Sequence, residues 1–309
     1  MLTFIATDIY GKDIILPQPL SVTINQEEAV PADDLTVVFP IIEGLSELDK
    51  IQVKQNDEIV FKGIVDEQQA ISNKSGAYTK IIARSMAAVL LDNESKPANY
   101  INPSTSVIYS RHLKPYGIEK YKGENQSLVG SFNVFKGSTN WQAFSNFCVQ
   151  TFGKIPRIES DGTANFNGLE RDKEITFGSD EGINYISVTE NNRRCQLISS
   201  VWAKTSAQGD YTTEITNDTA KDRKIKRERY FDATANSDLR VADKIINNSI
   251  DSSYELSLTC LGCYLNIIGS RAKVKDRHLG IIENLYVSGI CYALNSNGEF
   301  TKVLLKKER

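Results

Sequence analysis

Three carboxylates at alternate positions could supply a general acid and a general base. Glu170, Asp172 and Glu174 are separated by Arg171 and Lys173. A glycosidase uses two such groups, one to protonate the leaving oxygen and one to attack the sugar or activate water. Carboxylates that alternate with basic residues are also typical of a strand face in water. The alternation favours the solvent face, and the acidic residues stay the candidates for a hydrolase.

Two of the five cysteines form a Cys-x-x-Cys motif, Cys260 and Cys263. A zinc site would need two further ligands, and the chain has only two histidines, His112 and His278. A redox function is the other alternative. Cys260 takes the place of Phe39 in the repeat described below, where the side chain points inward. The pattern therefore favours a buried apolar thiol over a metal or redox site, and we expect no cofactor.

The two histidines complete no catalytic motif. His112 follows Arg111 in an expected helix, and His278 lies at an expected hairpin tip. Imidazole titrates near neutrality, so either could act as a general base. No nucleophile accompanies either one, and we expect both to be surface residues. The sequence also contains no GxSxG, P-loop, GxGxxG or HExxH motif. These observations argue against an enzyme and predict no catalytic residue.

Composition limits the classes of partner. The chain has 309 residues, of which 40% are hydrophobic, enough for two or three domains with cores. Its net charge of −3 argues against charge-driven binding to nucleic acids or anionic membranes. The basic run 221–229 is interrupted by Asp222 and Glu228, which favours a solvated strand or connector over a nucleic-acid site. No apolar run approaches the ~18 residues of a membrane span, and we expect a soluble protein made in the cytosol.

A strand pattern near the start of the chain recurs near its end, and these strands must position any site. Leu35–Pro40 corresponds to Leu256–Leu261 at a separation of 221 (256 − 35), and the next two segments follow in the same order. Ile51–Lys54 corresponds to Ala272–Lys275 at the same separation, and Gly63–Glu67 to Gly280–Asn284 at 217 (280 − 63). Amphipathic strands can resemble one another by chance. Three in one order nevertheless predict a β-module that is present twice.

The clearest predicted helix lies between the two copies. Thr139 and Gln142 form a capping-box pattern at its start, and Gly153 ends it. An aromatic stripe on such a helix could stack on a ligand, but its regular spacing favours a core; its members are Trp141, Phe144, Cys148 and Phe152, with Phe147 beside them. Shorter helices are predicted after Pro103–Ser106 and, capped by Ser237 and Asp238, through Leu239–Ile246.

The predicted fold class is mainly β with an α+β insertion: two related small β-barrel domains and a middle α+β domain. The first barrel is expected to comprise 1–98 with 190–215, the insertion 99–189, and the second barrel 216–309.

Several short motifs near both ends of the chain belong together. They are Val60–Glu67, Ala83–Glu94, Pro103–Ser104 with His112 and Pro115–Gly117, and then Glu255–Cys260, Gly280–Asn284 and Gly298–Thr301. These motifs resemble the baseplate hub proteins of contractile phage tails, the late-control-D-like and Mu-type group that also occurs in phage-derived bacteriocins (tailocins). The resemblance covers most of the chain and is weakest across 120–190. A departure is Leu261-Gly262-Cys263, where a Pro-Gly turn is expected.

The resemblance implies a homotrimer around an axial channel, whose duplicated barrels form a pseudo-sixfold ring between the sixfold tail tube and the trimeric central spike. It also implies contacts with a tube or tube-initiator protein, a tape-measure protein, and wedge or LysM-type baseplate proteins. The expected location is the baseplate of a virion or tail-like particle assembled in the host bacterial cytoplasm. We expect subunit contacts on the barrel strands, at Val37, Phe39, Lys54, Lys62, Lys273 and Lys275.

A second hypothesis comes from Gly137–Trp141, which resembles the start of a LysM module over one turn and one helix. Together with the acidic residues, it indicates a cell-wall-binding protein or peptidoglycan hydrolase of a phage tail.

Overall fold

The computed structural model describes residues 2–74, 76–179, 181–204, 209–232 and 240–308. Contacts divide the chain into two units. Unit 1 contains Met1–Ile175, Thr259–Arg271 and Val287–Val303, and unit 2 contains Thr176–Leu258, Ala272–Tyr286 and Leu304–Arg309. The architecture is mainly β, as predicted, with few helices.

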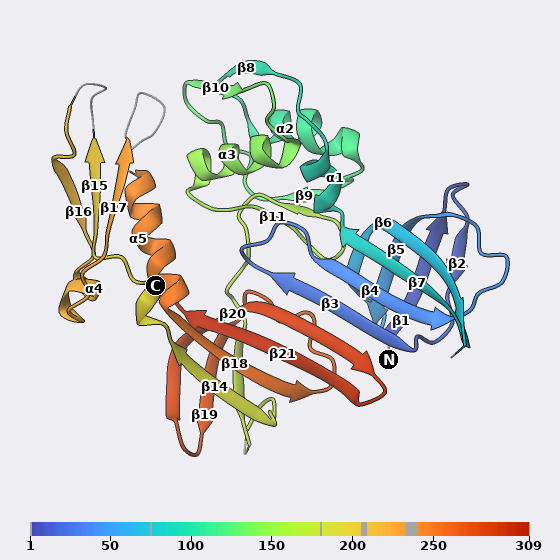
Figure 1. Cartoon of the computed structure of the whole chain (residues 1–309). Helices are drawn as coiled ribbons and strands as arrows, with labels where there is room; N and C mark the ends of the chain where they lie inside the picture. The colour runs from blue at the N-terminus through green and yellow to red at the C-terminus, as the bar shows by residue number, and fades with distance from the viewer. Residues whose placement is uncertain (1, 75, 180, 205–208, 233–239, 309) are drawn as a thin grey trace. The chain divides into compact units, whose positions relative to one another are not determined.

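Unit 1 begins with seven antiparallel strands, drawn in blue to cyan in Figure 1. Alternation of apolar and polar residues creates them: in β4, Leu35, Val37 and Phe39 are fully buried while the residues between them are half-buried. The strands are β1 (Leu2–Asp8), β2 (Asp13–Ile15), β3 (Ser21–Glu27), β4 (Asp34–Pro40), β5 (Leu48–Gln55), β6 (Glu58–Asn73) and β7 (Gly76–Ser85).

An α+β segment follows in unit 1. Its helical elements are α1 (Ala87–Asp92), α2 (Thr105–Ile108), α3 (Asn140–Phe152) and two short turns, η1 (Tyr109–Leu113) and η2 (Lys114–Tyr116). Its strands are short: β8 (Ala98–Ile101), β9 (Tyr121–Lys122), β10 (Ser131–Val134), β11 (Arg157–Ile158) and β12 (Ala164–Asn165).

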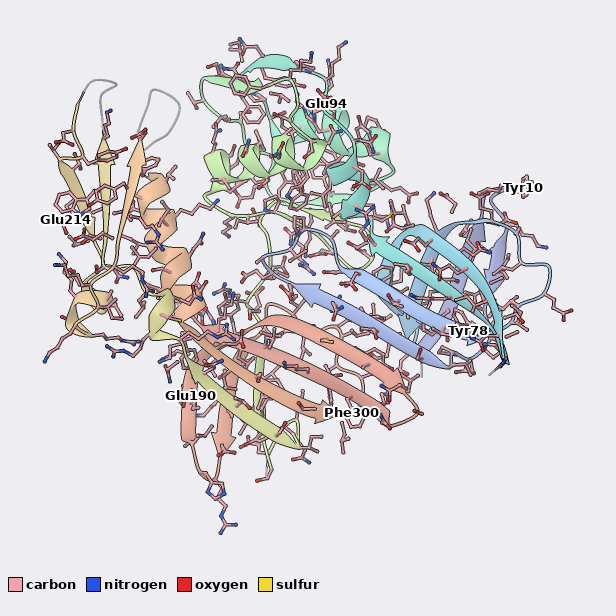
Figure 2. All side chains as sticks on the ribbon, in the orientation of Figure 1. Tyr10, Tyr78, Glu94, Glu190, Glu214 and Phe300 are labelled. Atoms are coloured by element: carbon pink, nitrogen blue, oxygen red, sulfur yellow. The ribbon has the colours of Figure 1, made fainter. Side chains whose placement is uncertain are left out.

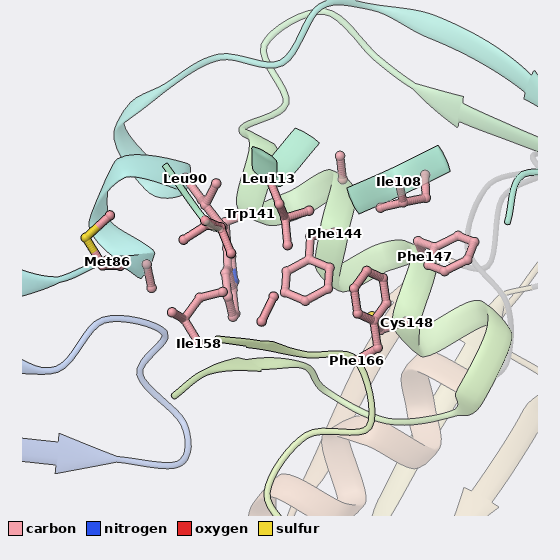
Figure 3. Packing of buried hydrophobic residues seen from close by; sticks show 14 of the residues in the cluster. Met86, Leu90, Ile108, Leu113, Trp141, Phe144, Phe147, Cys148, Ile158 and Phe166 are labelled. Atoms are coloured by element: carbon pink, nitrogen blue, oxygen red, sulfur yellow. The ribbon is translucent and has the colours of Figure 1, made fainter. Parts of the chain in front are cut away.

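Helix α3 starts and ends where its sequence predicts. The Thr139 side chain accepts the Gln142 N–H and the Gln142 side chain accepts the Thr139 N–H, at 3.1 and 2.9 Å, which completes the capping box. Gly153 ends the helix in the left-handed conformation. Figure 3 shows Phe144 and Phe147 in the core against Phe166. The aromatic stripe is therefore core, as its spacing indicates.

Unit 2 contains a three-stranded sheet of the order β16-β15-β17, which is covered by a helix, α5. Ile198 and Val201 pack against Ala242 and Ile246 of α5, which lies beside this sheet in Figure 1. The predicted caps of this helix, Ser237 and Asp238, lie outside the described residues. The elements are β13 (Glu174–Gly178), β14 (Ser187–Asn192), η3 (Arg194–Gln196), β15 (Ser200–Lys204), β16 (Thr213–Thr216), α4 (Asp218–Asp222), β17 (Glu228–Asp232) and α5 (Arg240–Ser253).

The main sheet has 13 strands: β1 to β7, β13, β14 and four further strands. These four are β18 (Tyr254–Leu261), β19 (Arg271–Asp276), β20 (Gly280–Asn295) and β21 (Gly298–Lys307). The strand order β3-β4-β7-β6-β5-β1 recurs as β14-β18-β21-β20-β19-β13. The predicted duplication therefore has the same topology in both copies. The domain limits expected from the sequence stay a prediction.

The correspondence of the third segment needs a correction. Leu35, Val37 and Phe39 match the equally buried Leu256, Leu258 and Cys260 at 221, as expected. For β6 and β20 the separation is 222 (280 − 58), and it is again 222 for β7 and β21 (298 − 76). The predicted separation of 217 is wrong because the turn before β20 (277–279) is one residue longer than the turn before β6 (56–57), with no loss of four residues.

Gly63 lies on β6 close to the backbone of β7. A Cβ built on Gly63 would stand 2.1 Å from the backbone oxygen of Arg84. We expect Gly63→Ala to lower the free energy of unfolding by about 1–3 kcal/mol, because the two strands must separate locally. Ser72→Ala, at an exposed position of the same strand, should change it by less than about 0.5 kcal/mol. Urea unfolding of both variants measures the difference, and equal values would contradict the steric argument.

Candidate assembly surface

The six residues predicted at subunit contacts differ in exposure. Val37 and Phe39 are fully buried in unit 1, whereas the four lysines are partly exposed. Lys273 pairs with Glu283, and Lys275 pairs with Glu181. Lys54 lies on β5 and Lys62 on β6. The interface role of all six, Val37, Phe39, Lys54, Lys62, Lys273 and Lys275, stays a prediction.

Two of the three acidic residues, Glu170 and Asp172, border a cavity of about 680 Å³ in unit 1, whereas Glu174 is not among its lining residues. Glu170 and Asp172 line it together with Glu159 and Asp161. Lys122 Nζ lies 2.9 Å from the Glu170 carboxylate and 2.8 Å from that of Glu159. Burial alone would lower the pKa of Lys122, but these two carboxylates outweigh it and raise the pKa. Glu170 thus forms an ion pair with Lys122, so its carboxylate already has a partner inside the chain.

The prediction that His112 is a surface residue is wrong, because its side chain is buried. Only 2% of it is exposed, and its ring nitrogens lie 2.9 Å from Ser95 Oγ and 3.0 Å from the Tyr100 hydroxyl. Asn140 Oδ1 is 3.2 Å from Nδ1. Ser95 is also buried, so a substrate could not reach this Ser–His pair. The contacts connect the segment before α2 to the start of α3.

Burial lowers the pKa of His112 below its usual 6.5. The unfolded chain therefore takes up this proton at a higher pH than the folded chain. The contribution of His112 to stability is complete above pH 6.5 and decreases as the pH falls toward the folded-state pKa, by about 1.4 kcal/mol per pH unit.

Unfolding at pH 7.5 and 5.5 should accordingly depend less on pH in His112→Gln than in the unsubstituted chain. His278→Gln, which alters an exposed histidine, should keep the full dependence. An unchanged pH dependence in His112→Gln would contradict the neutral, buried assignment.

The Cys-x-x-Cys motif contains protonated thiols. Cys260 is fully buried in β18, at the place of Phe39, as predicted. Burial raises the pKa of Cys260 to about 11 and that of Cys263 to about 12. A reactive or metal-bound cysteine has a lowered pKa instead. Within the described parts of the chain, no three His, Cys, Asp or Glu side chains gather in a way that could hold a metal ion.

Other predicted features also have places. The basic run covers the end of α4, an exposed connector and the start of β17. No helix in the described ranges is both long and apolar enough to cross a membrane.

Strand β20 pairs with two strands along one of its edges. Its first half lies beside β19, and its second half, Gly289–Leu294, pairs with β3 in an antiparallel register, Gly289 opposite Glu27 and Leu294 opposite Val22. Gly289, Ile290 and Tyr292 are buried there. Strand β20 belongs to the second module copy and β3 to the first, so this pairing joins the two copies.

The equivalent half of β6 has no described strand along one edge, where the Gln68 side chain accepts the Leu48 N–H at 3.0 Å and donates to the Ser46 carbonyl at 3.1 Å. A separation of 222 places Glu67–Ser72 at Gly289–Leu294. Strand β5 pairs only with Glu58–Ile64, and β7 occupies the opposite edge. Of the described strands, β5 and β7 are the neighbours of β6, and none of the six residues 67–72 is buried.

Strand β14 is the counterpart of β3 and forms one end of the main sheet. Ser187-Val188-Thr189-Glu190-Asn191 repeats Ser21-Val22-Thr23-Ile24-Asn25 in four of five residues at a separation of 166 (187 − 21). Its described neighbour is β18 alone, and the strand is not buried. Figure 2 labels Glu190 on this strand. Neither edge was predicted from the sequence, although the Ser-Val-Thr repeat could have indicated that β14 is the counterpart of β3.

These features define a duplicated β-module with a polar open edge on each copy and an α+β segment between the copies. The fold is that of phage tail proteins. No protein-family profile matches the sequence, and no curated protein does. The tail protein from Neisseria meningitidis MC58 matches with a TM-score of 0.76 at 18% identity, over 98% of this chain and 96% of that chain. The 43 kDa tail protein of prophage MuSo2 from Shewanella oneidensis matches with a TM-score of 0.77 at 15% identity, over 98% and 97%.

A more distant likeness extends to secretion systems. The E. coli c3393 protein matches with a TM-score of 0.55 at 8% identity, over 100% of this chain and 77% of that chain. That protein is described as a component of the type VI secretion system with structural similarity to the T4 bacteriophage tail proteins gp27 and gp5. The resemblance to tail hubs stated from the sequence thus agrees with the fold.

Proposed function

We propose that this chain is the structural baseplate hub of a contractile tail and assembles as a homotrimer. The observation that carries the proposal is the duplicated module, in which two copies share one strand order. Three such chains supply six similar positions, which can form a ring that faces a sixfold tube on one side and a trimeric spike on the other. The fold shared with tail proteins supports this function.

The proposed partners are the chain itself, the central spike protein, and a tube or tube-initiator protein. Tape-measure and wedge or LysM-type baseplate proteins are further candidates. The place of action is the baseplate of a phage or tailocin particle assembled in the bacterial cytoplasm. The chain acts through its surfaces and not as an enzyme, an assignment that the ion-paired Glu170 and the protonated thiols support.

Native mass spectrometry of the purified chain, with and without the candidate spike protein, tests the proposal. We expect three chains per particle. A protein that stays monomeric in both conditions and never enters tail particles would refute it. Zymography on peptidoglycan tests the alternative: lysis that disappears in Glu170→Gln with Asp172→Asn would establish a hydrolase in place of a purely structural hub.

A further inference from the structure

The junction between the two module copies within one chain is a template for the junction between chains. Inside the chain, Gly289–Leu294 of β20 pairs with β3. The counterpart of this half of β20 is Glu67–Ser72 of β6, and the counterpart of β3 is β14. Both counterparts have one open edge among the described strands. In a ring of equivalent modules, every junction repeats the same contact.

We infer that Glu67–Ser72 of one chain pairs in antiparallel fashion with β14 of a second copy of this chain, so that the main sheet continues from subunit to subunit. This inference rests on the proposed trimeric function and specifies its interface. It adds backbone hydrogen bonds at a sheet edge, a recurring mode of protein association.

Burial supports this assignment. In β20, three of the six residues beside β3 are buried, Gly289, Ile290 and Tyr292, whereas no residue of Glu67–Ser72 is buried. Likewise Val22 and Ile24 of β3 are buried, but β14 has no buried residue. The same module therefore has a covered junction at one copy and an uncovered one at the other. A second chain would cover the latter.

The register follows from the separations of 222 and 166. Because Cys291 is opposite Asn25, Gln69 is placed opposite Asn191. Because Gly289 is opposite Glu27, Glu67 is placed opposite Arg193, the residue after β14, which already pairs with Glu255 at 3.0 Å and would have a second carboxylate beside it. No two like charges face each other directly. The remaining opposed pairs are Gln68 with Asn192, Ala70 with Glu190, Ile71 with Thr189 and Ser72 with Val188.

The direction of each backbone group follows too. Glu28 N–H donates to the Ser288 carbonyl at 2.9 Å. Hydrogen-bonded pairs alternate along an antiparallel ladder, so Ile24 with Tyr292 is such a pair, and Asn25 with Cys291 is not. By equivalence, Ala70 directs its N–H outward to β14, while Gln69 and Asn191 form a close pair without hydrogen bonds. This geometry suits a disulfide, since Cα atoms there lie about 4.5 Å apart.

Cysteine cross-linking tests the register. Gln69→Cys and Asn191→Cys would be prepared as separate chains in a Cys195→Ser background, which removes the exposed thiol. Co-expressed and mildly oxidised, the two variants should give a disulfide-linked dimer on a non-reducing gel, and neither should do so alone. The control pairs Gln69→Cys with Ser187→Cys, four residues along β14 and about 13 Å away. Equal cross-linking of both pairs would overturn the register.

Proline substitution tests the backbone contact. Ala70→Pro removes an N–H that is not used within β6 and β7, and edge positions tolerate proline. We expect it to weaken trimer formation about tenfold or more, with an unchanged melting temperature of the isolated chain. Ala70→Val keeps the N–H and should still form trimers.

The same mass measurement separates the two proposals. If Ala70→Pro forms trimers with unchanged affinity and the cysteine pair gives no specific cross-link, the edge pairing is wrong but the hub function stands. If the unsubstituted chain forms no trimers, both the hub function and the pairing are wrong.

Discussion

Arg157→Met is expected to lower the free energy of unfolding by about 3–5 kcal/mol, because it leaves an unpaired carboxylate in the interior. Arg157 Nη2 donates to both oxygens of Asp33 at 2.7 and 3.0 Å, and Nη1 donates to the Glu27 carbonyl at 3.0 Å. Only 8% and 3% of these two side chains are exposed. The pair connects the α+β segment to the loop between β3 and β4.

Urea unfolding followed by the fluorescence of Trp141 measures this effect, in a Trp202→Phe background that leaves one tryptophan. Lys50→Met is the control, since the Lys50–Asp49 pair is about half exposed and should contribute less than about 1 kcal/mol. The double variant Arg157→Met with Asp33→Leu should recover much of the loss. A double variant as unstable as Arg157→Met would contradict the unpaired-charge explanation.

Phe144→Ala is expected to cost about 3–5 kcal/mol, the usual range for removal of a buried aromatic ring. Phe144 is fully buried, and its ring centroid lies 4.8 Å from that of Phe166 and 5.7 Å from that of Trp141. Figure 3 shows Phe144 among the other buried side chains of this cluster, beside Phe166. The same fluorescence assay reports this core directly, because Trp141 belongs to it.

The matched control is Phe135→Ala, since Phe135 lies in the same segment and is 66% exposed. We expect a change within about 0.5 kcal/mol. A loss as large as that of Phe144→Ala would mean that Phe135 packs against another part of the protein in solution. Burial in the single chain would then not explain which variant loses more free energy of unfolding.

Local sequence patterns predicted the elements whose causes are local. The capping box at Thr139 and Gln142 and the glycine stop at Gly153 mark both ends of α3. Alternation at Leu35, Val37 and Phe39 marked a strand and its buried face.

Features that depend on distant partners were missed. His112 was expected at the surface, but Ser95, Tyr100 and Asn140 approach its ring from three other parts of the chain. Nothing in the residues beside His112 shows these contacts. The residue separation of the long hairpins was also wrong, because a turn one residue longer moves the whole β20–β21 hairpin relative to β6–β7.

The sequence by itself determined the β-rich class, the duplication and the ends of α3, because periodicity and capping act over a few residues. Only the tertiary structure decided which strands are neighbours, and therefore that one half of β20 is covered by β3 while the equivalent half of β6 has an open edge. Strand pairing joins residues more than 200 positions apart. The residues of Glu67–Ser72 themselves do not show that no described strand lies along one of their edges. The physical reason is that an edge is defined by what lies beside a strand and not by the strand's own residues.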